Sequence, residues 1–129
     1  MQNRIYTGIL IIAILGIYIA TQHPLPAKMS DEKTSLQKIM DGNARFAAEQ
    51  PKHPDVSASR THEIAKKQQP YAVVIACSDS RVSPELVFDE GLGDLFVIRT
   101  AGNIISEVEL GSVEYAVEHL HAPLVIVMG

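Results

Sequence analysis

The chain opens with an apolar stretch that has no polar face. Residues 5–20 are almost wholly apolar, and residues 5–27 contain no Asp, Glu, Lys or Arg. Arg4 precedes the stretch, which is typical of a secretory signal peptide or a short membrane anchor and not of an amphipathic core helix. We therefore expect residues 1–27 to be a signal peptide or membrane anchor, with membrane attachment through residues 5–22. The rest of the chain is then exported, either periplasmic or membrane-anchored.

The remaining residues, 28–129, alternate between helical and extended patterns. Three short apolar runs rich in β-branched residues predict strands, and the first of them is the continuous run typical of a strand buried on both faces. These strands are predicted at residues 71–76, 95–98 and 124–128. Helices are predicted at residues 31–50, 61–69 and 109–121, and in a segment opened by Ser83-Pro84 and closed by Gly91 and Gly93.

This alternation predicts a single α/β domain over residues 28–129, with a parallel β-sheet and right-handed crossover helices. In such sheets the chemistry gathers where the strands end. The carboxyl ends of the predicted strands are residues 77–81, residues 99–103 and Gly129. We expect these three segments to lie at one edge of the sheet.

Composition excludes several classes of protein. Lys plus Arg number 11 and Asp plus Glu 15, a net charge of −4, so nothing favours a nucleic-acid partner. With 47% hydrophobic and 20% charged residues, the chain is not of the disordered class. The one cysteine, Cys77, excludes a disulfide within the chain.

Candidate chemistry follows directly after the first predicted strand, at Cys77, Asp79 and Arg81. A thiolate is a strong zinc ligand, and a carboxylate two residues on would bind the same metal or face a metal-bound water. An arginine beside that carboxylate would hold it ionised and oriented. The alternatives are a small buried thiol with a structural ion pair, or a phosphatase-like thiol loop. The phosphatase interpretation is disfavoured because only three residues, none of them Gly, separate the thiol from the arginine.

Residues 76–81, Ala-Cys-Ser-Asp-Ser-Arg, closely resemble the first zinc-binding motif of the β-class carbonic anhydrases. The resemblance extends from about residue 35 to residue 129, with the motifs in the family's order. It includes the family's N-terminal helix, its second strand and loop, and the next helix and strand, at residues 36–46, 94–103, 111–116 and 124–129.

The resemblance implies a Zn²⁺-dependent enzyme that hydrates carbon dioxide reversibly to bicarbonate through zinc-bound hydroxide. It implies that Cys77 is a zinc ligand and that Asp79 and Arg81 form the catalytic pair, with Asp79 a further zinc ligand in a closed form. Arg99 matches a position that some members use for a second bicarbonate. Family members are dimers or larger, so the resemblance also implies a homo-oligomer.

The family's zinc site needs a further His and, three residues later, a Cys, both after the strand predicted at residues 124–128. The sequence stops at Gly129, so we expect a C-terminally incomplete domain with weak zinc binding and little or no turnover. His119 and His121 end a crossover helix, which places them at the opposite edge of the sheet. Two alternatives remain open: a catalytically inactive, membrane-tethered remnant, and a related hydrolase of carbonyl sulfide or carbon disulfide.

Overall fold

The computed structural model describes residues 27–129, with side chains described from Thr34 onward. Within it, Asp31–Gly129 forms one compact unit. The signal peptide or anchor predicted for residues 1–27 lies, apart from Ala27, outside the described residues. Among the helices that the structure describes, none is both long and apolar enough to cross a membrane.

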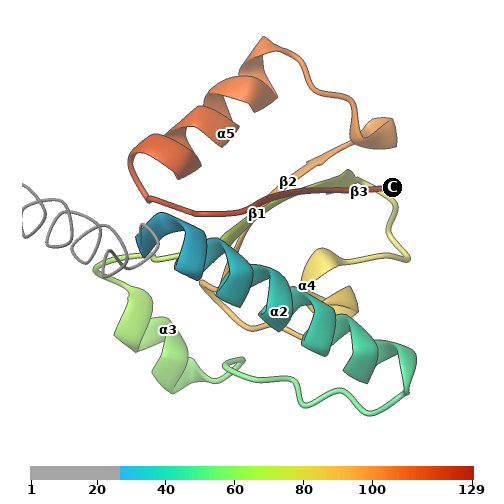
Figure 1. Cartoon of the computed structure of the whole chain (residues 1–129). Coiled ribbons are helices and arrows are strands. Elements are labelled where there is room, and N and C mark those ends of the chain that lie inside the picture. Colours follow the sequence, from blue (N-terminus) through green and yellow to red (C-terminus); the bar gives the residue numbers. More distant parts are fainter. Residues whose placement is uncertain (1–26) are drawn as a thin grey trace, which may run out of the picture. The chain divides into compact units, whose positions relative to one another are not determined.

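The predicted parallel sheet is confirmed. Its strands are β1 (Ala72–Cys77), β2 (Leu95–Thr100) and β3 (Val125–Met128), in the order β2-β1-β3, and β1 pairs in parallel with both neighbours. Figure 1 shows β1 in the middle of the sheet, with α2 and α4 on one face and α5 on the other. The helices are α2 (Ala27–Ala47), α3 (Ala58–Ile64), α4 (Pro84–Val87) and α5 (Glu107–Glu118), with a short 3₁₀ turn, η1 (Ala101–Asn103), after β2.

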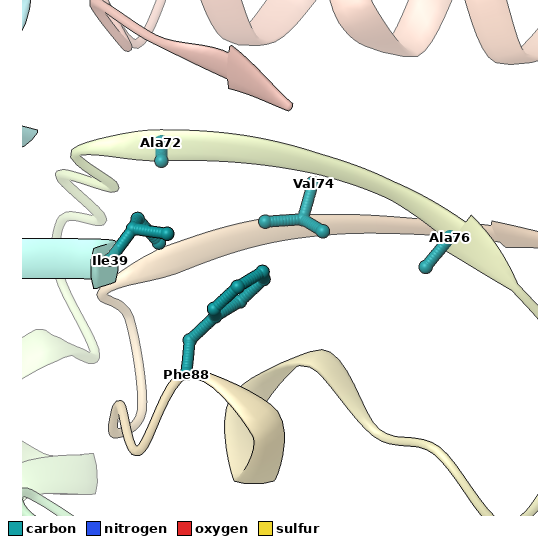
Figure 2. Close-up of a cluster of buried hydrophobic side chains, with 5 residues drawn as sticks. All are labelled: Ile39, Ala72, Val74, Ala76 and Phe88. Atoms are coloured by element: carbon teal, nitrogen blue, oxygen red, sulfur yellow. The ribbon is translucent and has the colours of Figure 1, made fainter. Parts of the chain in front are cut away.

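The central strand forms the core of the unit, because every residue from 72 to 76 is at most 6% exposed. Alternate side chains of β1 point to opposite faces of the sheet. Toward α2 and α4 they form one cluster, which Figure 2 shows and which consists of Ile39, Ala72, Val74, Ala76 and Phe88. Toward α5 they form a second cluster of Val73, Ile75, Ile98, Ala116 and Ala122. The prediction of a strand buried on both faces is confirmed.

The helices on the α2 side form where predicted, with different bounds. The helix predicted over residues 61–69 starts earlier, because the Ser57 side chain accepts a hydrogen bond from the Arg60 backbone N–H at 3.2 Å and caps α3. The helix predicted over residues 31–50 ends earlier. There Glu49 adopts a left-handed φ of 56°, a common way for a helix to stop.

The two remaining helices also depart from the predicted bounds. The helix opened at Ser83 is the single turn α4, because the chain turns at Asp89, where φ is 49°, and brings that carboxylate inside. The helix predicted over residues 109–121 begins earlier, after Ser106. The Ser106 backbone N–H and the carboxylate of Glu109 form a capping box that starts α5.

Helix α2 packs closely on α4 through Gly42 and Asn43. A Cβ added at Gly42 would lie 1.7 Å from the carbonyl oxygen of Phe88, so no larger residue fits without moving the helix. Beside it, Asn43 Nδ2 donates to the Val87 carbonyl oxygen at 3.1 Å. Glycine and asparagine both have low helix propensity, so the pair is unfavourable for the helix by itself. In the structure, Gly42 permits the close contact between α2 and α4, and the hydrogen bond of Asn43 holds it in place.

The carboxylate of Asp89 is buried and ties three segments together. It accepts hydrogen bonds from Arg45 Nε at 2.5 Å and from the backbone N–H groups of Lys52 at 3.0 Å and His53 at 2.9 Å. Burial on its own raises the pKa of Asp89, but the bonds from Arg45 and the two backbone groups outweigh burial and lower this pKa to about 2. The charged carboxylate therefore joins α2, the loop after it and α4.

Replacing glycine by alanine should have opposite effects at two helical positions. Gly42→Ala places a methyl group against backbone, and we expect it to lower the free energy of unfolding by about 3 kcal/mol or more. Gly111→Ala, in α5, meets nothing within 4 Å and should raise it by about 0.5–1 kcal/mol. Urea unfolding of the purified variants measures both changes. Equal effects at the two positions would contradict the close packing of α2 on α4.

Asp89 should make the unit sensitive to acid. Its pKa is about 2 in the fold against an ordinary 3.8, so its contribution is complete above about pH 4 and is lost as pH falls toward 2. We expect Asp89→Asn to lower the free energy of unfolding at pH 7 by about 2–4 kcal/mol and to flatten its dependence on pH between 4 and 2. Urea unfolding at a series of pH values measures this.

The matched control is Asp41→Asn. The Asp41 carboxylate is exposed and accepts one hydrogen bond, from Gln37 Nε2 at 2.8 Å. This change should stay within about 0.5 kcal/mol and leave the acid transition as it is. If Asp89→Asn behaves like its control, the buried carboxylate does not hold these segments together.

Candidate functional site

The candidate site lies on the loop of residues 77–82, which follows the central strand. In the register of the sheet, Cys77 of β1 lies opposite Thr100 of β2, so the loop meets the segment that leaves β2. The end of β3 is also near, because a Cβ built on Gly129 would lie 3.8 Å from Asn103 Nδ2. The three strand ends therefore meet at one edge, as the sequence predicts.

Asp79 and Arg81 form a bidentate ion pair in this loop. Arg81 Nε donates to Asp79 Oδ1 at 3.0 Å and Arg81 Nη2 to Asp79 Oδ2 at 2.7 Å, while the Arg81 backbone N–H donates to Oδ1 at 2.9 Å. These side-chain and backbone bonds lower the pKa of Asp79 to about 2. The carboxylate is thus ionised and fixed in direction at neutral pH. To serve as a metal ligand, Asp79 would have to leave Arg81.

The thiol of Cys77 is partly buried and lies against backbone donors. The Gly102 backbone N–H donates to Cys77 Sγ at 3.3 Å, which η1 permits because Gly102 adopts a left-handed φ of 67°. Hydrogen bonding from the backbone of Gly102, and then of Asp79, lowers the pKa of the thiol. A lowered pKa favours the thiolate, which is the form that binds metal.

Arg99 holds the loop from the end of β2. Its Nε donates to the Cys77 carbonyl oxygen at 2.9 Å, and its Nη2 donates to the carbonyl oxygens of Asp79 at 2.5 Å and Val82 at 2.9 Å. This clamp was not predicted from the sequence. The parallel arrangement could have indicated it, because such a sheet brings the carboxyl end of one strand beside the loop that follows its neighbour. Binding of bicarbonate by Arg99 stays a prediction.

The described residues bring together two of the sequence-predicted donors, Cys77 and Asp79. Over residues 34–129, no group of three or more His, Cys, Asp and Glu side chains could hold a metal ion. His119 and His121 follow the last turn of α5 and precede β3, on the side of the sheet where its strands begin. The roles of Cys77, Asp79 and Arg81 in metal binding and catalysis stay predictions.

The fold and the loop together define an α/β protein with a candidate metal centre at the carboxyl edge of a parallel sheet. The family model described as Carbonic anhydrase matches residues 72–129. A carbonic anhydrase of Mycolicibacterium smegmatis is 49% identical over 100 residues, which cover 78% of this chain and 48% of the relative. Carbonic anhydrase 2 of Mycobacterium tuberculosis strain H37Rv is 50% identical over 91 residues, which cover 70% of this chain and 44% of the relative.

Solved structures agree with these relatives. The β-carbonic anhydrase CafA of Aspergillus fumigatus superposes with a TM-score of 0.52 at 29% identity, over 75% of this chain and 45% of that one. A tetrameric β-carbonic anhydrase of Sordaria macrospora gives a TM-score of 0.51 at 30% identity, over 76% of this chain and 49% of that one. The chain belongs to the β-class carbonic anhydrase family. It spans about half the length of the relatives it matches.

Removing the Arg99 clamp should loosen the candidate site. We expect Arg99→Met to speed amide hydrogen exchange of residues 78–82 about 10-fold or more, because three hydrogen bonds are lost from the guanidinium and each stabilises the closed loop by about 0.5–1.5 kcal/mol. Arg99→Lys should lie between this variant and the original protein, since one ammonium cannot reproduce the planar fork. Hydrogen exchange followed by mass spectrometry or NMR measures the change.

Arg60→Met is the matched control, because Arg60 Nε also donates to a backbone carbonyl, that of Leu92 at 3.0 Å, outside the loop. It should leave exchange of residues 78–82 unchanged. Unchanged exchange in Arg99→Met would mean that strand pairing alone holds the loop.

Proposed function

We propose that this chain carries part of the active site of a zinc-dependent carbonic anhydrase, and that the whole protein hydrates carbon dioxide reversibly to bicarbonate and a proton. The observation that carries the proposal is the bidentate Asp79–Arg81 pair beside the Cys77 thiol, at the end of the central strand. It occurs in a chain that is 49% identical over 100 residues to a carbonic anhydrase. The loop has the ligand chemistry, the fixed carboxylate and the position that such an enzyme needs.

The residues present fit zinc in the chemistry of their donors. Cys77 has a thiol whose pKa is lowered by backbone N–H groups, and thiolate is a preferred zinc ligand. Cys77 would hold the ion, and Asp79 would become a further ligand only by leaving Arg81. When bound, zinc acts as a Lewis acid that lowers the pKa of a water from about 15.7 toward ~7, which makes hydroxide available near neutral pH.

The other groups of the site orient the attacking water and fix the backbone of the loop. Asp79, ionised and held at both oxygens by Arg81, can accept a hydrogen bond from the attacking water and so set the direction of its lone pair. Arg99 fixes the backbone on which Cys77 and Asp79 stand. The pair thus acts by positioning, and the charge on Arg81 keeps the carboxylate an acceptor across the neutral range.

The proposal includes export and assembly. The apolar residues 5–20 favour export or membrane attachment of the unit, through residues 5–22. Exposed apolar side chains on α2, at Leu36, Met40 and Phe46, support assembly of copies into a homo-oligomer. The structural relative from Sordaria macrospora is tetrameric.

A chimera tests the function. We propose to join this chain to the remaining C-terminal part of the Mycolicibacterium smegmatis relative and to compare it with the chain itself. The chimera should bind zinc and hydrate carbon dioxide, whereas the chain should bind less than one zinc and turn over little. Elemental analysis measures zinc, and stopped-flow measurement with a pH indicator measures hydration.

Three variants of the chimera assign the roles. Cys77→Ser should lose zinc and activity together. Asp79→Asn should keep zinc and lose activity roughly 100-fold or more, and Ser80→Ala, an exposed neighbour in the same loop, should keep both. A chimera that folds, binds zinc and does not hydrate carbon dioxide would overturn the proposal. It would favour the inactive tethered module or, if carbonyl sulfide or carbon disulfide is consumed, the related hydrolase.

A further inference from the structure

Two adjoining recesses lie at the edge of the sheet opposite the candidate site. The larger, of about 830 Å³, is formed by residues 64–69 and by the end of α5 with the residues after it. The smaller, of about 280 Å³, includes residues 69–71 and Thr34 of α2. Gln69 and His121 line both. Since residues 69–71 directly precede β1, the recesses mark the edge at which the strands begin.

These recesses are lined by bases and by no acids. Among the described residues that line them there are three lysines and two histidines, with no Asp or Glu, in a chain whose net charge is −4. We name this set the basic end surface: Lys38, Lys66, Lys67, His119 and His121.

Most of the basic end surface is open to solvent. Lys66, Lys67, His119 and His121 are all exposed. Lys38 differs, because its ammonium lies 4.7 Å from the centre of the Tyr71 ring and also borders a recess lined by four carboxylates. Lys66 and Lys67 therefore carry the charge of this surface.

The described side chains of α2 begin at this same end of the unit. Thr34 and Ser35 of α2 line the smaller recess. From residue 20, the end of the apolar stretch, to Thr34 the chain can reach at most roughly 35 Å, counting a helical rise over residues 27–33 and full extension before it. A bilayer that held residues 5–20 would therefore lie within that reach of Thr34, and the basic end surface could contact it.

We propose that the basic end surface binds the phosphate groups of an anionic membrane surface. This rests on the proposed membrane attachment through residues 5–22. Phosphate groups attract lysine ammonium groups and accept hydrogen bonds from imidazole and amide N–H groups, and the surface offers all three. The binding orients the unit with the start of its strands toward the bilayer. The Cys77 loop, at the opposite edge, then faces the solution from which a small substrate arrives.

Vesicle flotation of the full chain tests this. The purified chain in mild detergent is diluted into vesicles of phosphatidylcholine alone or with 30% phosphatidylglycerol, at pH 7.5 and 0.1 M salt. Lys66→Gln and Lys67→Gln should each weaken partition onto the anionic vesicles roughly fivefold, and the double variant about 25-fold. Partition onto neutral vesicles should not change. Salt at 0.5 M should remove most of the difference between the two kinds of vesicle.

Lys52→Gln is the matched control. Lys52 is exposed, carries the same charge and lines neither recess, so its change should leave partition within twofold. An effect of Lys52→Gln as large as that of Lys66→Gln would show attraction by overall charge and would overturn the proposal. Equal partition of the double variant and the original chain onto anionic vesicles would also overturn it.

A second experiment distinguishes a lipid surface from a soluble anion as the ligand of the basic end surface. Inorganic phosphate is titrated into the full chain in neutral detergent while the imidazole signals of His119 and His121 are followed by NMR. Saturation below 1 mM phosphate, with vesicle partition insensitive to the two lysines, would assign the surface to a soluble anion and overturn the membrane proposal. If the original chain does not bind neutral vesicles, that result counts only against attachment through residues 5–22. None of these results bears on carbon dioxide hydration.

Discussion

The parallel pairing of β1 with β2 is the interaction on which the rest of this structure depends. Its register places Cys77 opposite Thr100, so residues separated by about a helix and a turn arrive at one edge. Only in that register do the Arg99 guanidinium and the Gly102 N–H meet the loop after β1. A slip of one residue would turn Arg99 to the other face and leave the loop without its clamp. The candidate site is thus a consequence of strand register more than of any one side chain.

The two faces of the sheet are held by different means. On the α5 side, packing is apolar, through Val73 and Ile75 of the central strand. On the α2 side, apolar packing is joined by a buried charge, because Asp89 gathers Arg45 and two backbone N–H groups. Close approach at Gly42 lets that network form. Burying an ion pair has a desolvation penalty that offsets part of its attraction. The pair therefore contributes to the specific packing of α2 on α4 as much as to stability.

Much of the fold could be predicted from the sequence. Each predicted strand forms within one or two residues of its expected position, because continuous β-branched runs have few other uses in a chain of this size. The helix ends could not be placed as well. They depend on caps such as Ser57 and Ser106 and on the inward turn at Asp89, which involve partners distant from the periodic pattern. Gly42-Asn43, which lowers helix propensity locally, is explained only by the backbone of α4 against it.

The sequence by itself determined the alternation of strands and helices, the family, and the loop that pairs Asp79 with Arg81. That pair needs no distant partner, because two residues in one tight turn reach each other whatever surrounds them. Tertiary structure decided what the loop is fastened to. The Arg99 clamp and the Gly102 N–H against Cys77 arise because parallel strands end together. Contacts between segments far apart in the chain are set by register and packing, which no local pattern of residues contains.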